Sequence, residues 1–108
     1  MWGICQDVSL YQENLYGCVV EYQITDRNTA VMMQPVSGAE TDIRNIQPLH
    51  TPPRFRYGDA AAPVSHPEQI GSIREIRWHF RNNAYYFILS VNNKRISKRY
   101  YEADLIPV

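Results

Sequence analysis

Residues 71–91, GSIREIRWHFRNNAYYFILSV, contain the pattern that decides the fold class. Ile76, Trp78 and Phe80 alternate with polar side chains, which is the period of a strand with one buried face. Ile73 is out of phase with these three residues, and a slip of one residue inside a strand predicts a bulge. The stretch therefore begins with a bent strand whose apolar side chains face a core.

The residues that follow extend this strand into an antiparallel meander. Asparagines at 82–83 predict a turn, because Asn tolerates left-handed backbone angles. Residues 85–91 are apolar on both faces, so we expect a strand that is covered on both sides. The rest of the pattern predicts, in order, a tight turn at 92–93, a return strand at 94–100 with mostly basic outward side chains, one helical turn at 102–105 and a closing strand at 106–108.

The first half of the chain repeats this order of elements with weak identity. Trp2-Gly3 is matched by Tyr57-Gly58, and residues 17–19, GCV, are matched by residues 71–73, GSI, at an offset of 54 positions. Both halves then show an apolar strand, an Asn-containing turn and a second apolar strand. Self-similarity at a fixed spacing favours an internal duplication.

A proline-rich stretch separates the two copies. Residues 47–53, QPLHTPP, contain three prolines, which cannot sustain a helix or a central strand. We expect residues 1–49 to form the first repeat, residues 50–55 a stiff linker and residues 56–108 the second repeat. A repeat of this size buries little surface alone, so we expect the two repeats to pack into one compact unit.

Four stretches of the second repeat occur in the order seen in a known class of small barrels. They are Tyr57-Gly58-Asp59, Ile70-Gly71-Ser72-Ile73, Trp78-His79-Phe80 and Tyr100-Tyr101-Glu102-Ala103-Asp104-Leu105. Together they resemble SH3-like small β-barrels, closely over residues 55–108 and loosely over residues 2–49. They are also similar to small bacterial proteins of that shape. The resemblance implies an all-β fold with two SH3-like small barrels.

The same resemblance does not extend to the function of signalling SH3 domains. Their long first loop is acidic and rich in aromatic residues, and the corresponding loop here is not, so recognition of proline-rich peptides is not expected. The barrel fold itself supports many functions and selects none of them.

Charge is unevenly distributed although the net charge is zero. Residues 1–53 carry −4 and residues 54–108 carry +4, counting Lys, Arg, Asp and Glu. Such a chain can pair its halves, associate with a second copy or offer a basic face to an acidic partner. No apolar run approaches the roughly 20 residues of a membrane-spanning helix. The opening residues, MWGICQD, lack the basic region and apolar stretch of a secretory signal, so we expect a cytoplasmic protein.

Residues that could carry chemistry are scattered. Cys5 and Cys18 are expected to be reduced, partly buried thiols, although a disulfide between them stays open. The three histidines, at positions 50, 66 and 79, lack metal-ligand spacing. Gly58 and Gly71 are interpreted as turn glycines, since no glycine-rich phosphate loop is present. We therefore predict no catalytic residues, no metal and no cofactor, and a hydrolase-like site near Asp59 and His66 is only a distant third hypothesis.

The second repeat contains more aromatic and basic side chains than its core needs. Tyr, Trp and Arg are enriched at the centres of protein interfaces. We therefore predict a non-enzymatic binding or adaptor module whose partner is a protein, a peptide or a second copy of the chain. Weak binding of single-stranded nucleic acid by the same face is the alternative. The predicted face consists of Trp78, His79, Tyr85, Tyr86, Arg95, Arg99, Tyr100 and Tyr101.

Overall fold

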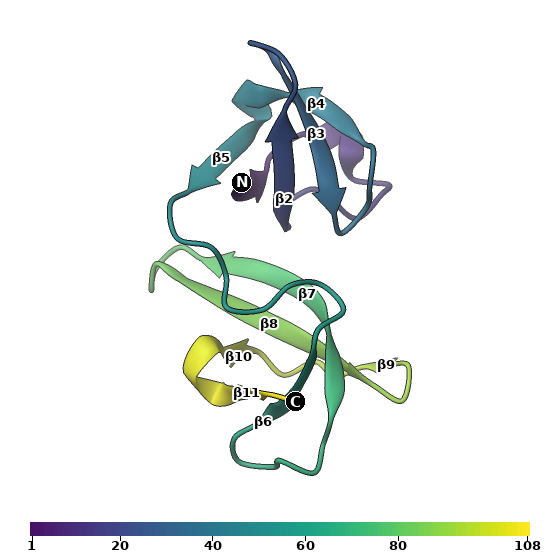
Figure 1. Cartoon of the computed structure of the whole chain (residues 1–108), viewed down its shortest axis with the longest axis vertical. Helices are drawn as coiled ribbons and strands as arrows, with labels where there is room; N and C mark the ends of the chain where they lie inside the picture. The colour runs from purple at the N-terminus through teal and green to yellow at the C-terminus, as the bar shows by residue number, and fades with distance from the viewer. The chain divides into compact units, whose positions relative to one another are not determined.

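All regular elements of the chain are β-strands or single 3₁₀ turns. The computed structural model describes residues 1–108 and divides them into two compact units, Met1–Pro52 and Pro53–Val108. Each unit contains one antiparallel sheet (Figure 1). No helix has the length and apolar character needed to cross a membrane. The all-β fold class predicted from the sequence is confirmed.

The first unit is a five-stranded sheet in the order β4-β3-β2-β1-β5. Its core gathers on one face of the sheet and includes the thiols of Cys5 and Cys18, which are buried and form no disulfide, as expected for reduced cysteines. Burial raises the pKa of the Cys5 thiol; a hydrogen bond from the Asp7 backbone opposes this effect, and the charge of the Asp7 carboxylate adds to it. The elements are β1 (Trp2–Cys5), η1 (Val8–Leu10), β2 (Val19–Ile24), β3 (Thr29–Gln34), β4 (Glu40–Asp42), η2 (Ile43–Asn45) and β5 (Ile46–Leu49).

The second unit is a sheet in the order β10-β8-β7-β6-β11, with β9 also paired to β8. Its core is formed by fully buried side chains such as Ile76, Phe87 and Leu105. The Phe55 ring packs edge-on against Phe87, with the ring centroids 5.5 Å apart. The elements are β6 (Ala60–Pro63), β7 (Gly71–His79), β8 (Ala84–Val91), β9 (Lys94–Arg95), β10 (Tyr100–Tyr101), η3 (Glu102–Asp104) and β11 (Leu105–Pro107).

When strands are counted within each unit and β9 is left out of the count, the two sheets have the same strand order and the same antiparallel pairing; the β8–β9 pair is present only in the second. Each has a 3₁₀ turn directly before its last strand. In each sheet the paired strands form one continuous series, which extends from β4 to β5 in the first sheet and from β10 to β11 in the second. The two dipeptides matched in the sequence do not occupy equivalent places in the two units. Trp2-Gly3 lies inside β1, whereas Tyr57-Gly58 precedes β6.

The predicted bend of β7 is confirmed. Its register with β8 shifts between Ile73 and Glu75, and β2 shifts against β3 between Glu21 and Tyr22. A bulge leaves one residue unpaired and increases the local twist of the strand. The Asn turns are confirmed as well: Asn83, Asn92 and Asn93 have positive φ angles of 47°, 53° and 63°.

Three details of the sequence interpretation are wrong. Residues 94–100 do not form one strand, because the chain leaves the β8 edge after the bond from the Ile96 N–H to the Leu89 carbonyl and rejoins it at Tyr100. Phe80 is 60% exposed because β7 ends at His79. Gly71 is not a turn glycine but lies inside β7, where the backbone of β8 approaches it closely.

A candidate recognition face on the second sheet

Strand register places a set of large polar side chains on one face of the second sheet. Tyr86 in β8 lies opposite Arg77 in β7 on one side and opposite Tyr101 in β10 on the other. Directly paired residues of antiparallel strands project from the same face. We call this set the Tyr–Arg face, and it comprises Glu75, Arg77, His79, Tyr86, Arg95, Arg99 and Tyr101.

Three rings form the centre of the Tyr–Arg face. The imidazole of His79 lies 6.4 Å from the Tyr86 ring and 6.1 Å from the Tyr101 ring, centroid to centroid, both in edge-to-face orientation. All three side chains are half-buried. Each ring therefore keeps part of its surface available to a partner while its neighbours restrict its motion.

The turn between β7 and β8 fixes the orientation of two of these rings. The Asn82 backbone N–H donates to His79 Nδ1 at 3.2 Å, and the Asn82 side-chain amide donates to the Tyr101 hydroxyl at 3.1 Å. Because Nδ1 of His79 accepts a hydrogen bond, the proton of the neutral imidazole resides on Nε2. Asn82 thereby links the end of β7 to β10.

Arg99 covers the Tyr86 ring. Its guanidinium carbon lies 4.8 Å from the ring centroid, within the range of a cation–π contact. The Arg99 side chain is exposed and forms no ion pair. Its charge is therefore available for an external carboxylate.

Glu75 holds two other arginines in place. Its carboxylate accepts hydrogen bonds from Arg95 Nε at 2.5 Å and from Arg77 Nε at 3.4 Å. Burial alone would raise the pKa of Glu75, but the charged hydrogen bonds from Arg95 and Arg77 outweigh it and lower the pKa. With Arg99 included, the Tyr–Arg face keeps an excess of positive charge.

The structure divides the eight predicted site residues between two faces. His79, Tyr86, Arg95, Arg99 and Tyr101 come together on the Tyr–Arg face. The other three are their immediate neighbours along the strands and therefore project to the opposite side. On that side lie Trp78, Tyr85 and Tyr100.

The three residues on the opposite side serve the core of the unit. Tyr85 and Tyr100 are only 3% and 6% exposed. Trp78 is half-buried with its ring edge-on to Tyr85, at a centroid distance of 5.0 Å. Burial raises the pKa of Tyr85 to about 12, and the charge of Glu102 contributes in the same direction.

Sequence reasoning missed Glu75, Arg77 and Asn82 as members or supports of this face. The information was present, because a turn at 82–83 fixes the register of the hairpin and sets Arg77 opposite Tyr86. Asp59 and His66 are both exposed and have local partners. Asp59 Oδ2 accepts a hydrogen bond from the Arg56 N–H, and His66 Nδ1 lies 3.0 Å from Ser65 Oγ.

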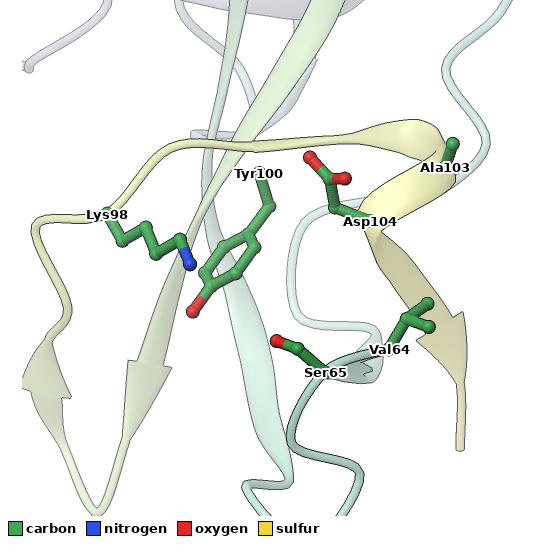
Figure 2. Close-up of a pocket in the computed structure, with 6 residues that line it drawn as sticks. All are labelled: Val64, Ser65, Lys98, Tyr100, Ala103 and Asp104. Atoms are coloured by element: carbon green, nitrogen blue, oxygen red, sulfur yellow. The ribbon is translucent and has the colours of Figure 1, made fainter.

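Tyr100 has a second environment. It lines a pocket of about 360 Å³ together with Lys98 from the segment before β10, with residues of η3 and with residues of the loop after β6 (Figure 2). This pocket lies on the side of β10 to which Tyr100 projects, whereas Tyr101 belongs to the Tyr–Arg face.

Fold and face together define a small all-β protein with two antiparallel sheets, the second of which presents a cluster of rings and arginines. Residues 43–106 match the model of a family of unknown function, DUF6960, and the chain belongs to this family. The match begins in η2 of the first unit and includes every residue of the Tyr–Arg face. No curated protein and no solved structure matches the chain.

Proposed function

We propose that this protein is a non-enzymatic binding module that recognises a segment of another protein with its Tyr–Arg face. The observation that carries the proposal is the Arg99 guanidinium lying over the Tyr86 ring with no carboxylate partner. A partner would bury an apolar or aromatic side chain against the rings of His79, Tyr86 and Tyr101. Its acidic residues would pair with Arg99 and Arg95 at the rim.

The preorganisation of the face supports this proposal. Tyr and Arg are enriched at interface hot spots because they bury much surface and lose little rotamer freedom when their neighbours already hold them. Asn82 orients two of the rings, and Glu75 orients Arg77 and Arg95. An arginine fork matches a carboxylate with two parallel hydrogen bonds, so acidic residues are the expected complement.

Charge also favours an acidic protein segment over a nucleic acid strand. The second unit carries a net charge of +4, and a carboxylate, Glu75, lies within the face. A carboxylate at that place repels phosphates, whereas a peptide can position its own acidic groups around it. The experiment must therefore distinguish binding of an acidic peptide from binding of a single-stranded nucleic acid.

We further propose that the two units arose by duplication of one SH3-like barrel module. The shared strand order, the 3₁₀ turn before each last strand and the bulge in each second strand support this interpretation. The Tyr–Arg face has no counterpart with rings and arginines at the equivalent strands β2, β3 and β4, whose sequences are VVEYQI, TAVMMQ and ETD. Under this proposal the second copy carries the recognition function.

A peptide-display selection tests the proposal because it finds ligands from a random library. The full-length chain is immobilised, the library is selected on it, and the recovered peptides are measured by calorimetry. We expect peptides with acidic residues beside an aromatic or large apolar residue. Tyr86→Ala and Arg99→Ala should each weaken binding about tenfold or more. Lys94→Ala, which removes an exposed charge in β9 outside the face, should leave it unchanged.

Two further measurements identify the other outcomes. A labelled thymidine oligomer is titrated at about 50 and about 200 mM salt, where phosphate-dominated binding falls steeply. Light scattering over a range of protein concentrations reports self-association. Peptides that bind both alanine variants as tightly as the wild type would contradict the proposal. Tight oligomer binding together with an empty peptide selection would replace it with the nucleic acid alternative.

A further inference from the structure

The pocket beside Tyr100 combines opposite charges in one small space. Figure 2 shows the Tyr100 ring crossing its centre, with Lys98 on one side and Asp104 on the other. Its volume of about 360 Å³ falls in the range of small-molecule sites, roughly 300–1,000 Å³. The remaining lining residues are Val64, Ser65 and Ala103.

One end of the pocket carries hydrogen-bond donors. Lys98 Nζ lies 5.3 Å from the Tyr100 ring centroid, which holds the ammonium group over the ring. The hydroxyls of Tyr100 and Ser65 point toward this same end (Figure 2). An ammonium and two hydroxyl groups together suit a carboxylate.

The other end carries a fixed negative charge. Asp104 Oδ2 accepts a hydrogen bond from the Tyr101 backbone N–H at 2.9 Å, which anchors the side chain. A carboxylate has lone pairs beyond the one used there, so Asp104 can accept a hydrogen bond from a ligand ammonium group as well. Because Tyr101 fixes its position, this acceptor is ready before a ligand arrives.

Three hydrogen bonds from two residues, Val64 and Arg54, hold the wall between these ends. The Val64 N–H donates to the Asp104 carbonyl at 2.8 Å, which ties the loop after β6 to η3. Arg54 Nη1 donates to the carbonyls of Glu102 and Leu105, at 2.9 and 2.8 Å. The 3₁₀ turn that carries Asp104 is therefore braced on both of its flanks.

We propose that this pocket binds a small zwitterion, a molecule such as an amino acid that carries one ammonium and one carboxylate group. The ligand carboxylate pairs with Lys98 and the two hydroxyls, and its ammonium pairs with Asp104. Val64 and Ala103 contact the carbons between the two groups. A simple anion meets repulsion from Asp104 and a simple cation meets repulsion from Lys98, so only a ligand with both charges satisfies both ends.

Nuclear magnetic resonance titration of the full-length chain tests this site. The probes are glycine, 4-aminobutyrate and 6-aminohexanoate, which differ in the spacing of their charges, with acetate and methylammonium as ligands of one charge. The readout is the backbone amide shifts of Val64, Ser65 and Ala103. We expect saturable shifts from at least one zwitterion, with an affinity about tenfold or more above that for acetate and methylammonium.

Substitutions assign the two ends separately. Lys98→Met removes the ammonium and Asp104→Asn removes the negative charge while retaining an oxygen for the Tyr101 N–H, and each should weaken the best zwitterion about tenfold. Lys94→Met is the matched control for loss of a surface lysine, and thermal unfolding verifies that each variant is folded. Acetate binding as well as the best zwitterion, unchanged affinity in either folded variant, or no saturable shift from any probe would overturn the proposal.

Discussion

The guanidinium of Arg99 lies over the ring of Tyr86 on the Tyr–Arg face of the second sheet. The guanidinium carbon of Arg99 lies 4.8 Å from the centroid of the Tyr86 ring, and the same ring lies 6.4 Å from the imidazole of His79. Stacking of this kind restricts an otherwise flexible exposed side chain. The charge of Arg99 is thus presented at a defined position beside the rings rather than distributed over the surface.

Replacing Arg99 with lysine tests whether peptide binding depends on the positive charge alone or also on the planar shape of the guanidinium. Lysine keeps the positive charge but lacks the planar fork that both covers the ring and pairs with two carboxylate oxygens. We expect Arg99→Lys to weaken binding of a selected acidic peptide about fivefold, with calorimetry as the measurement. The thermal midpoint should stay unchanged, since the side chain is exposed. Wild-type affinity in this variant would show that a positive charge at this position is enough for peptide binding and that the planar guanidinium is not needed.

Glu75 should make the free energy of unfolding of the second unit depend on pH in the acidic range. Its pKa is lowered in the folded chain, so it binds a proton less readily there than in the unfolded chain, where the value is about 4.3. The stabilisation is fully present above that pH and is lost as pH falls through the lowered pKa. Glu75→Gln should reduce the free energy of unfolding at neutral pH by about 1 kcal/mol, a modest value because both arginines remain partly solvated.

Urea titrations at a series of pH values measure this effect. Wild type and Glu75→Gln should differ at neutral pH and converge as the solution is acidified below about pH 4. Glu68→Gln is the matched control, because Glu68 is an exposed residue of the loop after β6. Curves that remain parallel down to the acid limit would show that the two arginines do not stabilise the folded carboxylate.

Two glycines of the second unit are required for different reasons. A Cβ at Gly71 would lie 2.7 Å from the Ser90 carbonyl oxygen, so the close approach of β7 and β8 excludes any side chain. Gly58 has open space around it but a φ of +85°. Gly71→Ala should cost about 1–3 kcal/mol through overlap, and Gly58→Ala about 1–2 kcal/mol through the left-handed backbone.

Asparagine distinguishes the two causes, because it tolerates left-handed angles but still carries a Cβ. Gly58→Asn should recover part of the stability lost in Gly58→Ala, whereas Gly71→Asn should be at least as destabilised as Gly71→Ala. Chemical denaturation measures all four variants. Recovery by asparagine at Gly71 would mean that β7 can move away from Ser90 at little cost.

Local patterns in the sequence predicted the local structure well. The phase slip between Ile73 and Ile76 predicted the bulge because a bulge is itself a change of phase in one strand. The asparagines predicted the turns because their backbone angles are a property of single residues. The all-β class followed from the same information.

The arrangement of the aromatic side chains could not be predicted in the same way. Residues 85–91 are apolar on both faces, and residues 100–101 are two tyrosines, so alternation cannot tell which ring of each pair faces the core. That choice depends on the register of three strands, Tyr101 opposite Tyr86 and Tyr86 opposite Arg77. The predicted set therefore mixed residues from two faces of one sheet.

Tyr85, on the buried side, should make the folded chain sensitive to alkali. Its phenol has a pKa of about 12 in the folded chain, against about 10 when unfolded. The unfolded chain therefore releases this proton first, so its contribution to stability is complete below about pH 10 and is lost between about pH 10 and 12. In Tyr85→Phe the thermal midpoint should fall less steeply over this interval than in wild type. Tyr11→Phe, at a 68% exposed residue, is the control; equal slopes in all three proteins would mean that the Tyr85 phenol ionises as readily folded as unfolded.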